Sequence, residues 1–318
     1  MVFGLTTRWN ARRHRSGESM IEEILELGID HVELGYDTRR DLIPGVLSMV
    51  EQGAVSVDSV HNFCPVPMTV SRGHPEIYTF ADRDPRVRQQ AVRHTTTTIR
   101  FAAEVGANVV VTHCGNVEMK PLTAQLLRLL SEGKGYTRRF ERTMTKLREQ
   151  REKRGPVQFG YLLESLERLL PVLRETGIRL ALEVLPSWEA FPSELEFESI
   201  FERFRSRHLW YWHDIGHAKI RENLGFSNVE RWLERLRPRL AGMHLHDVRS
   251  PGEDHLMPPN GDIDFSRYTR FLNSDMLRVL EPRSSATGNE IREGLRHFRE
   301  AWESDNAGAE DVNEERIQ

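Results

Sequence analysis

The sequence predicts an α/β fold, a single (β/α)8 TIM barrel with a helical insertion after the fourth strand. The 318 residues are enough for one barrel of this kind. Short apolar, β-rich runs alternate with longer runs of helical spacing, which is typical of a parallel sheet covered by helices. Eight such strands favour closure into a barrel. No GxGxxG turn follows the first strand, so the pattern of a dinucleotide-binding sheet is missing.

The predicted strands are short and mostly continuous in apolar residues, as expected when both faces are covered. They span 2–6, 30–34, 54–60, 107–113, 178–184, 208–214, 241–247 and 276–281.

The predicted helices end at glycines or begin at capping residues. Asp84 and Pro85 form an N-cap and first-turn pair, and Gly28, Gly106 and Gly177 each end a helical run. The helices span 16–27, 85–105, 158–175, 228–236 and 291–302.

The chain divides into a barrel over residues 1–302 and a polar, acidic tail over 303–318, which its composition predicts to be disordered. Residues 115–156 are a long, charged, helix-prone insertion. We interpret it as a solvated helical hairpin. The alternative is a lid or a contact between copies in a homo-oligomer, because the loops that follow barrel strands border the active face.

Composition limits the classes of function. The net charge of −4 provides no basic field for nucleic acid, which makes such a partner unlikely. Two cysteines do not make a disulfide scaffold. No apolar run reaches the roughly 20 residues that span a bilayer, and the N-terminus lacks the order of a signal peptide. We therefore expect a cytoplasmic protein without membrane contact.

Side chains that can bind metals recur where the predicted strands end. A barrel brings all eight strand ends to one mouth, and several carboxylates cannot lie close together there without a cation or shared protons. The mixture of carboxylates and imidazoles indicates a divalent ion, Zn²⁺, Mn²⁺, Co²⁺ or Mg²⁺. The candidates are Glu33, His61, His113, Glu183, Asp214, His217, His244, His246, Asp254, His255 and Glu281.

Strand parity tests this convergence, because alternate residues face the barrel interior. His244 and His246 share a face. If Asp214 faces inward with Trp212, then His213 points to the helices and is a structural residue.

Several of these segments resemble the xylose isomerase-like, or AP endonuclease family 2, TIM barrels. WHDIGHAKI resembles their D-x-x-H segment, HLHDV their seventh strand, and EDHLMPPNGDIDF their DHxxPGxGxIDF loop. LALEVLP and RVLEP resemble their fifth-strand and eighth-strand glutamate segments. The resemblance runs over nearly the whole chain.

The resemblance implies a mononuclear metal site made by Glu183, Asp214, His244 and Glu281. In members that isomerise or epimerise sugars, the two glutamates also transfer the proton. His217 is then a substrate or second-metal residue.

The endonuclease IV branch implies further zinc ligands. His61 and His113 occupy the positions of histidines that bind these ions. Glu253 or Asp254 with His255 resembles the last ligand pair, but the branch has D-x-H where this chain has E-D-H.

Residues around the predicted mouth indicate the kind of ligand. Arg8, Arg249 and Arg283 follow the first, seventh and eighth strands, and with Glu33 they are candidates for binding a small anionic or sugar-like substrate. Cys64 and Cys114 lie near the mouth and are interpreted as small buried residues rather than metal ligands.

Three functions are consistent with this pattern. The first is a metal-dependent sugar or sugar-phosphate isomerase or epimerase that transfers a proton through an enediolate between Glu183 and Glu281. The second is a phosphoester hydrolase with several metal ions, held by additional ligands such as His61, His113 and His255. A non-catalytic sugar-binding barrel is the third and is disfavoured by the intact ligand set. One ion per chain favours the first, and two or three favour the second.

Overall fold

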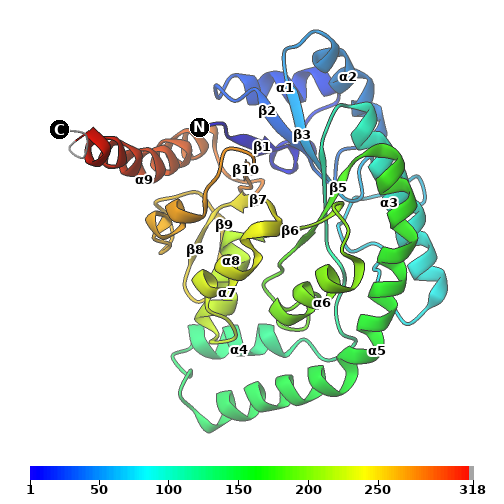
Figure 1. Cartoon of the computed structure of the whole chain (residues 1–318), viewed down its shortest axis with the longest axis vertical. Coiled ribbons are helices and arrows are strands. Elements are labelled where there is room, and N and C mark those ends of the chain that lie inside the picture. Colours follow the sequence, from blue (N-terminus) through cyan, green and yellow to red (C-terminus); the bar gives the residue numbers. More distant parts are fainter. Residues whose placement is uncertain (315–318) are drawn as a thin grey trace.

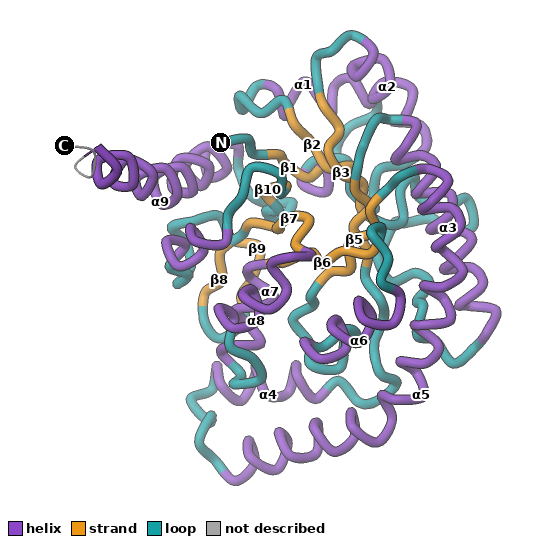
Figure 2. Tube along the Cα trace, in the orientation of Figure 1, coloured by secondary structure: helices purple, strands orange, loops and turns teal. Residues whose placement is uncertain are grey.

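The computed structural model describes the backbone of residues 1–314 and the side chains of residues 1–302. Eight parallel strands close into a barrel in chain order, with β1 hydrogen-bonded to both β2 and β10. The predicted fold class is confirmed (Figures 1 and 2). The barrel strands are β1 (Gly4–Thr6), β2 (His31–Leu34), β3 (Ser56–His61), β4 (Val109–Thr112), β5 (Arg179–Glu183), β6 (Leu209–Asp214), β7 (Leu240–Leu245) and β10 (Leu277–Leu280).

Helices surround the barrel, and their starts follow the predicted caps. Ser16, Asp84 and Asn228 each accept a backbone N–H bond at the start of α1, α3 and α8. Three helices were not predicted: α2, α6 and α7. The helices outside the insertion are α1 (Gly17–Leu25), α2 (Ile43–Glu51), α3 (Pro85–Glu104), α6 (Glu194–Phe204), α7 (Ile215–Asn223), α8 (Val229–Leu236) and α9 (Gly288–Glu314).

The insertion after β4 contains α4 (Leu122–Ser131) and the start of α5 (Arg138–Thr176). The predicted helix start at 158 is wrong, because α5 continues through Pro156. Arg151, one turn earlier, holds this part of the helix by bonding to the carbonyl of Trp188 at 2.6 Å and to Glu196 at 2.7 Å. α4 packs against the first half of α5 at one edge of the molecule (Figure 1).

The C-terminal helix differs from the expected end of the folded region. α9 continues to Glu314, so residues 303–314 extend a helix where the acidic composition predicts disorder. Ser, Asp, Asn and Gly, which have low helix propensity, outnumber alanine and glutamate here, so composition does not account for this extension of the helix that begins at Gly288. Residues 315–318 lie outside the described residues.

The barrel interior is filled below its mouth by apolar side chains. Val109, Val111, Ala181, Trp212 and Val279 belong to one buried cluster. The ring of Trp212 occupies space left by Gly242, where an added Cβ would lie 2.5 Å from the ring. The parity of these strands then places the next inward residue of each strand at the mouth.

Two antiparallel strands follow β7 at this end of the barrel. β8 (Asp247–Arg249) and β9 (Glu253–Leu256) form a hairpin. It brings the backbone N–H of His255 to within 2.9 Å of Nδ1 of His246. Within the described residues, no helix combines the length and the apolar content needed to cross a membrane.

Candidate metal centre

Four side chains from β5, β6, β7 and the end of β10 converge at the mouth. Nδ1 of His244 lies 3.3 Å from Oε1 of Glu183, 3.2 Å from Oε2 of Glu281 and 3.7 Å from Oδ2 of Asp214. All four residues are buried, and their donor atoms lie within 4.8 Å of one another. Parity explains the convergence: Ala181, Trp212 and Val279 fill the barrel two residues before the three carboxylates.

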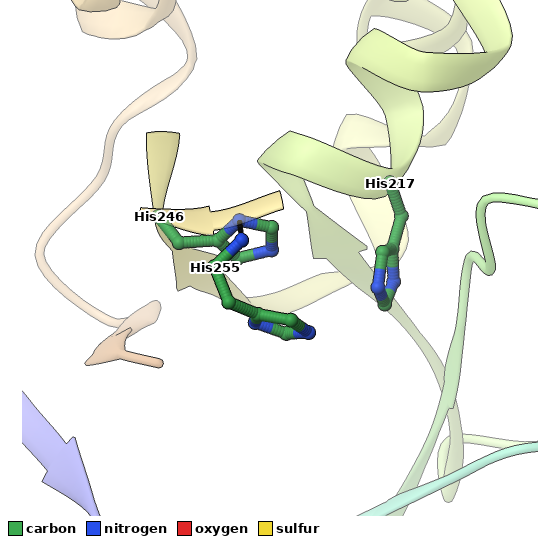
Figure 3. Close-up of side chains that lie close together, drawn as sticks. All are labelled: His217, His246 and His255. Atoms are coloured by element: carbon green, nitrogen blue, oxygen red, sulfur yellow. Dashed lines mark hydrogen bonds between the residues drawn. The ribbon is translucent and has the colours of Figure 1, made fainter. Parts of the chain in front are cut away.

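Two further donor groups adjoin this one. In the first, Nε2 of His61 and Nε2 of His113 lie 3.1 and 3.2 Å from Oε2 of Glu183. Glu183 therefore belongs to both groups, with one oxygen toward each. The second consists of His217, His246 and His255, whose rings face one another at the start of α7 and the β8–β9 hairpin (Figure 3).

Backbone carbonyls determine the tautomers of three histidines. Nδ1 of His61 donates to the carbonyl of Asn62 at 2.9 Å. Nδ1 of His217 donates to Val184 at 3.1 Å, and Nδ1 of His255 to Glu281 at 3.0 Å. A carbonyl can only accept, so Nδ1 carries the proton and Nε2 is the nitrogen that can bind a metal. Metal-binding histidines are commonly oriented in this way.

His246 differs from these three because both of its nitrogens have partners. Nδ1 accepts the backbone N–H of His255, so Nε2 carries the proton and donates to Oδ1 of Asp214 at 2.9 Å. Its ring lies over Gly216, where an added Cβ would be 2.0 Å from Cε1. His246 thus orients Asp214 from the side away from His244.

Glu33 lies deeper than predicted. Its Oε1 is 3.1 Å from Nε2 of His244, its Oε2 accepts a 2.8 Å bond from Ser59, and its side chain is buried. It is not among the residues that line the adjacent cavity, and its contact with a substrate stays a prediction. Glu33 instead orients His244.

Burial and neighbouring groups shift the pKa values in this cluster in different directions. Burial raises the pKa of Glu183, but the neighbouring imidazoles of His113 and His244 outweigh it and hold that pKa well below its ordinary value. Burial lowers the pKa of His217, but Asp214 and Glu183 raise it to about 9. Burial and the neighbouring His246 keep the pKa of His255 well below its ordinary value.

The donor set fits a divalent cation. Three carboxylates face one buried point, and within the described residues no hydrogen bond reaches Oδ2 of Asp214. Buried carboxylates at this spacing require positive charge between them. Oxygen and imidazole donors together suit Zn²⁺, Mn²⁺ or Co²⁺.

A cavity of about 290 Å³ lies beside the donors, and several of the residues that line it were not predicted. Arg8 was predicted; its Nε donates to the Tyr36 hydroxyl at 2.6 Å, and its Nη1 lies 3.6 Å from Oε1 of Glu281. Asn116 donates to Glu76 at 2.9 Å on another wall. The new lining residues with polar side chains are Tyr36, His74, Glu76, Asn116 and Ser187.

Other predicted residues lie outside this cavity. Arg249 and Arg283 are exposed and pair with Glu253 on the hairpin at 2.9 and 3.5 Å, and their contact with a substrate stays a prediction. Asp254 belongs to none of the three donor groups. His246 belongs to the group that also contains His217 and His255. Asp254 still lies close enough for its charge to raise the pKa of His217 and of His246.

The remaining polar residues have structural surroundings. Nδ1 of His213 shares a 2.5 Å hydrogen bond with the hydroxyl of Tyr211. Both side chains lie outside the barrel interior, as strand parity predicts for His213. Cys64 and Cys114 are buried, and burial raises the pKa of both thiols. Neither belongs to a donor group.

The fold and the donors define a TIM barrel with a candidate metal centre at the carboxyl ends of its strands. The chain belongs to the xylose isomerase-like TIM barrel family, which matches residues 21–301. An uncharacterized protein of Methanocaldococcus jannaschii is 21% identical over 265 residues, covering 81% of this chain and 83% of that protein.

Solved structures with the same fold include several sugar epimerases. A D-tagatose 3-epimerase-like protein has a TM-score of 0.70 and 19% identity, covering 97% of this chain and all of its own. An L-ribulose 3-epimerase has a TM-score of 0.69 and 16% identity, covering 98% of each chain. The 3-keto-D-glucoside 4-epimerase of E. coli has a TM-score of 0.67 and 17% identity, covering 94% of this chain and 99% of its own. At these identities the likeness establishes the fold.

Proposed function

We propose that this protein is a divalent-metal-dependent isomerase or epimerase of a small sugar or sugar derivative. The observation that carries the proposal is that Glu183 and Glu281 face the same buried point and both line one cavity. The cavity volume of about 290 Å³ suits a small molecule. The epimerase activities named for similar structures support the same class.

The two glutamates supply the proton transfer. Glu183, Asp214, His244 and Glu281 would hold the ion, which would polarise a substrate carbonyl and acidify the adjacent C–H bond. One glutamate removes that proton and leaves an enediolate. The other, which starts as the carboxylic acid, gives its proton to the same carbon from the opposite face to form the epimer. To form the isomer, the proton goes to the neighbouring carbon while a hydroxyl proton moves between the two oxygens of the enediolate.

The surrounding residues keep these groups in position. The low pKa of Glu183 leaves it as a carboxylate that can accept a proton. Glu33 orients His244, and His246 orients Asp214, through bonds of 3.1 and 2.9 Å. The hydroxyl and amide groups of Tyr36 and Asn116 are available to hydroxyls of a sugar.

Deuterium incorporation tests this mechanism. Protein loaded with Mn²⁺ is incubated in D₂O with D-tagatose, L-ribulose and D-fructose, and carbon-bound deuterium is followed by NMR. We expect incorporation next to the carbonyl, and its loss in Glu183→Gln. Glu118→Gln, at an exposed position, is the matched control and should retain it. Product formation without deuterium incorporation, or unchanged activity in Glu183→Gln, would contradict the proposal.

A phosphoester hydrolase is the second candidate, favoured by one specific observation. His61 and His113 both approach Oε2 of Glu183, so that oxygen faces a second donor group. A second ion there would generate a hydroxide and stabilise a leaving oxygen.

The two candidates are separated by the variants His61→Asn and His113→Asn with bis(p-nitrophenyl) phosphate and glucose 6-phosphate as probes. A hydrolase should lose phosphate-ester cleavage in both variants and contain two or three ions by elemental analysis. An isomerase should show no ester cleavage with any metal.

A further inference from the structure

A second cavity of about 370 Å³ adjoins the cavity beside the metal donors. The two share one wall, made by Glu76, Asn116, Pro186 and Ser187. The far side of the second cavity is built by the start of the insertion and by α4. A ligand bound in the first cavity can therefore extend toward the second cavity.

The far wall of this second cavity is apolar. Val117, Met119, Pro121, Ala124 and Leu127 line it. Ala124 and Pro121 are exposed, and Met119 and Leu127 are only half-buried, so this apolar surface remains accessible beside the polar site. Accessible apolar surface next to a site is typical of a place where a ligand binds.

The one charged group on the far side, Glu189, has both of its carboxylate oxygens hydrogen-bonded to Thr123. Oε1 of Glu189 accepts the backbone N–H of Thr123 at 2.9 Å, and Oε2 accepts its hydroxyl. The same hydroxyl accepts the backbone N–H of Trp188 at 3.0 Å. These bonds connect α4 to the loop after β5, and they give both oxygens of Glu189 partners inside the protein.

Most of the polar groups lie on the shared wall, and the two on the far side, Thr123 and Glu189, are hydrogen-bonded to each other. Asn116 donates to Oε1 of Glu76 at 2.9 Å, and Ser187 donates to Oδ1 of Asn116 at 3.3 Å. The combined space thus has the metal donors at one end, the carboxylate of Glu76 with the polar groups of Asn116 and Ser187 in the middle, and apolar side chains at α4. A sugar carrying an apolar substituent has the same order of groups.

We propose that the cavity under α4 is a second subsite, which binds an uncharged aliphatic or aromatic substituent of a sugar-derived substrate. This assignment rests on the proposed function for the sugar half, because the first cavity has to receive the sugar. The helical insertion then has a role in substrate selection, since residues 117–127 supply the apolar wall.

Two glucosides that differ only in the substituent test the subsite. Phenyl and methyl β-D-glucoside are titrated into Mn²⁺-loaded protein by calorimetry. We expect the phenyl compound to bind at least about tenfold more tightly, because burying an aromatic ring is favourable. Ala124→Phe fills the subsite and should remove this preference. Arg128→Phe, at an exposed position of α4 outside the cavity, is the matched control and should keep it.

Phenol alone separates failure of the subsite from failure of the proposed function. Its binding is measured by saturation-transfer NMR with the wild-type protein and with Ala124→Phe, whose folding is checked by circular dichroism. Phenol that binds the wild type and not the variant supports the subsite, even if neither glucoside binds and the sugar half is wrong. Absence of phenol binding, or a phenyl preference that persists in Ala124→Phe, overturns the proposal.

Discussion

Nε2 of His246 donates a 2.9 Å hydrogen bond to Oδ1 of Asp214, while the other ring nitrogen of His246 accepts the backbone N–H of His255. This leaves Oδ2 of Asp214 directed to the side where His244, Glu183 and Glu281 lie. The hairpin after β7 thereby controls the orientation of a carboxylate at the end of β6.

Replacement of His246 should weaken metal binding more than it weakens the fold. Loss of a hydrogen-bond partner behind a ligand typically costs about 10- to 100-fold in metal affinity. We expect a loss of that order in His246→Ala, measured by competition with a chromophoric chelator. His246→Gln retains an N–H donor and should recover part of it. Equal affinities for wild type and His246→Ala would exclude the orienting role.

Gly216 should tolerate no larger residue, because an added Cβ would lie 2.0 Å from Cε1 of His246. Gly216→Ala should displace the ring, cost about 1–3 kcal/mol of unfolding free energy and lower metal affinity with it. Gly160→Ala is the control: it lies in α5 with no neighbour within 4 Å of the added atom. It should stabilise the protein by about 0.5–1 kcal/mol. Chemical denaturation of both variants measures this, and similar shifts in the two would contradict the steric argument.

The convergence of the candidate metal donors was predictable because a barrel strand has a strict period of two. Once Val111, Ala181 and Val279 are recognised as inward residues, His113, Glu183 and Glu281 must follow them at the mouth. The carboxyl ends of all eight strands lie at one mouth of the barrel, which brings these side chains together.

The loops and the depth of individual residues were not predictable in the same way. Glu76 and Asn116 lie in loops without periodicity, so nothing in the sequence places them in the cavity. Glu33 has the correct parity, but its contact with His244 depends on how far β2 is staggered in the barrel. The continuation of α5 through Pro156 depends on the tertiary contacts of Arg151.

Metal binding should release protons and strengthen as pH rises. In the metal-free protein His217 has a pKa of about 9, raised by Asp214 and Glu183 against the effect of burial, so it is protonated at pH 7. An ion held by Glu183, Asp214, His244 and Glu281 would bring positive charge beside this ring, so binding should lower the pKa of His217 and displace that proton. Affinity should therefore rise with pH up to about 9 and fall toward acid pH.

Calorimetry in two buffers with different ionisation enthalpies measures the number of protons released. We expect release at pH 7 and less release in His217→Asn, which removes the titrating ring. Identical apparent enthalpies in the two buffers would show that no proton is displaced. Chelation with EDTA should restore the metal-free state and allow the titration to be repeated on the same sample.

Arg8 should determine how strongly the site prefers anionic substrates. Arg8 lines the cavity, and its Nη1 is buried. Within the described residues this nitrogen donates no hydrogen bond, although Oε1 of Glu281 lies 3.6 Å away. A phosphate or carboxylate of the substrate would satisfy this donor and gain a charged hydrogen bond. Arg8→Met should raise KM for sugar phosphates by about 10-fold or more, which is the scale of about 1.5–3 kcal/mol for a bond to a charged group. Neutral sugars should show a much smaller change.

Arg12→Met, which removes an exposed guanidinium paired with Asp37, is the control. If KM rises equally for neutral and phosphorylated sugars in Arg8→Met, Arg8 acts by orienting Tyr36 and Glu281 rather than by binding an anion.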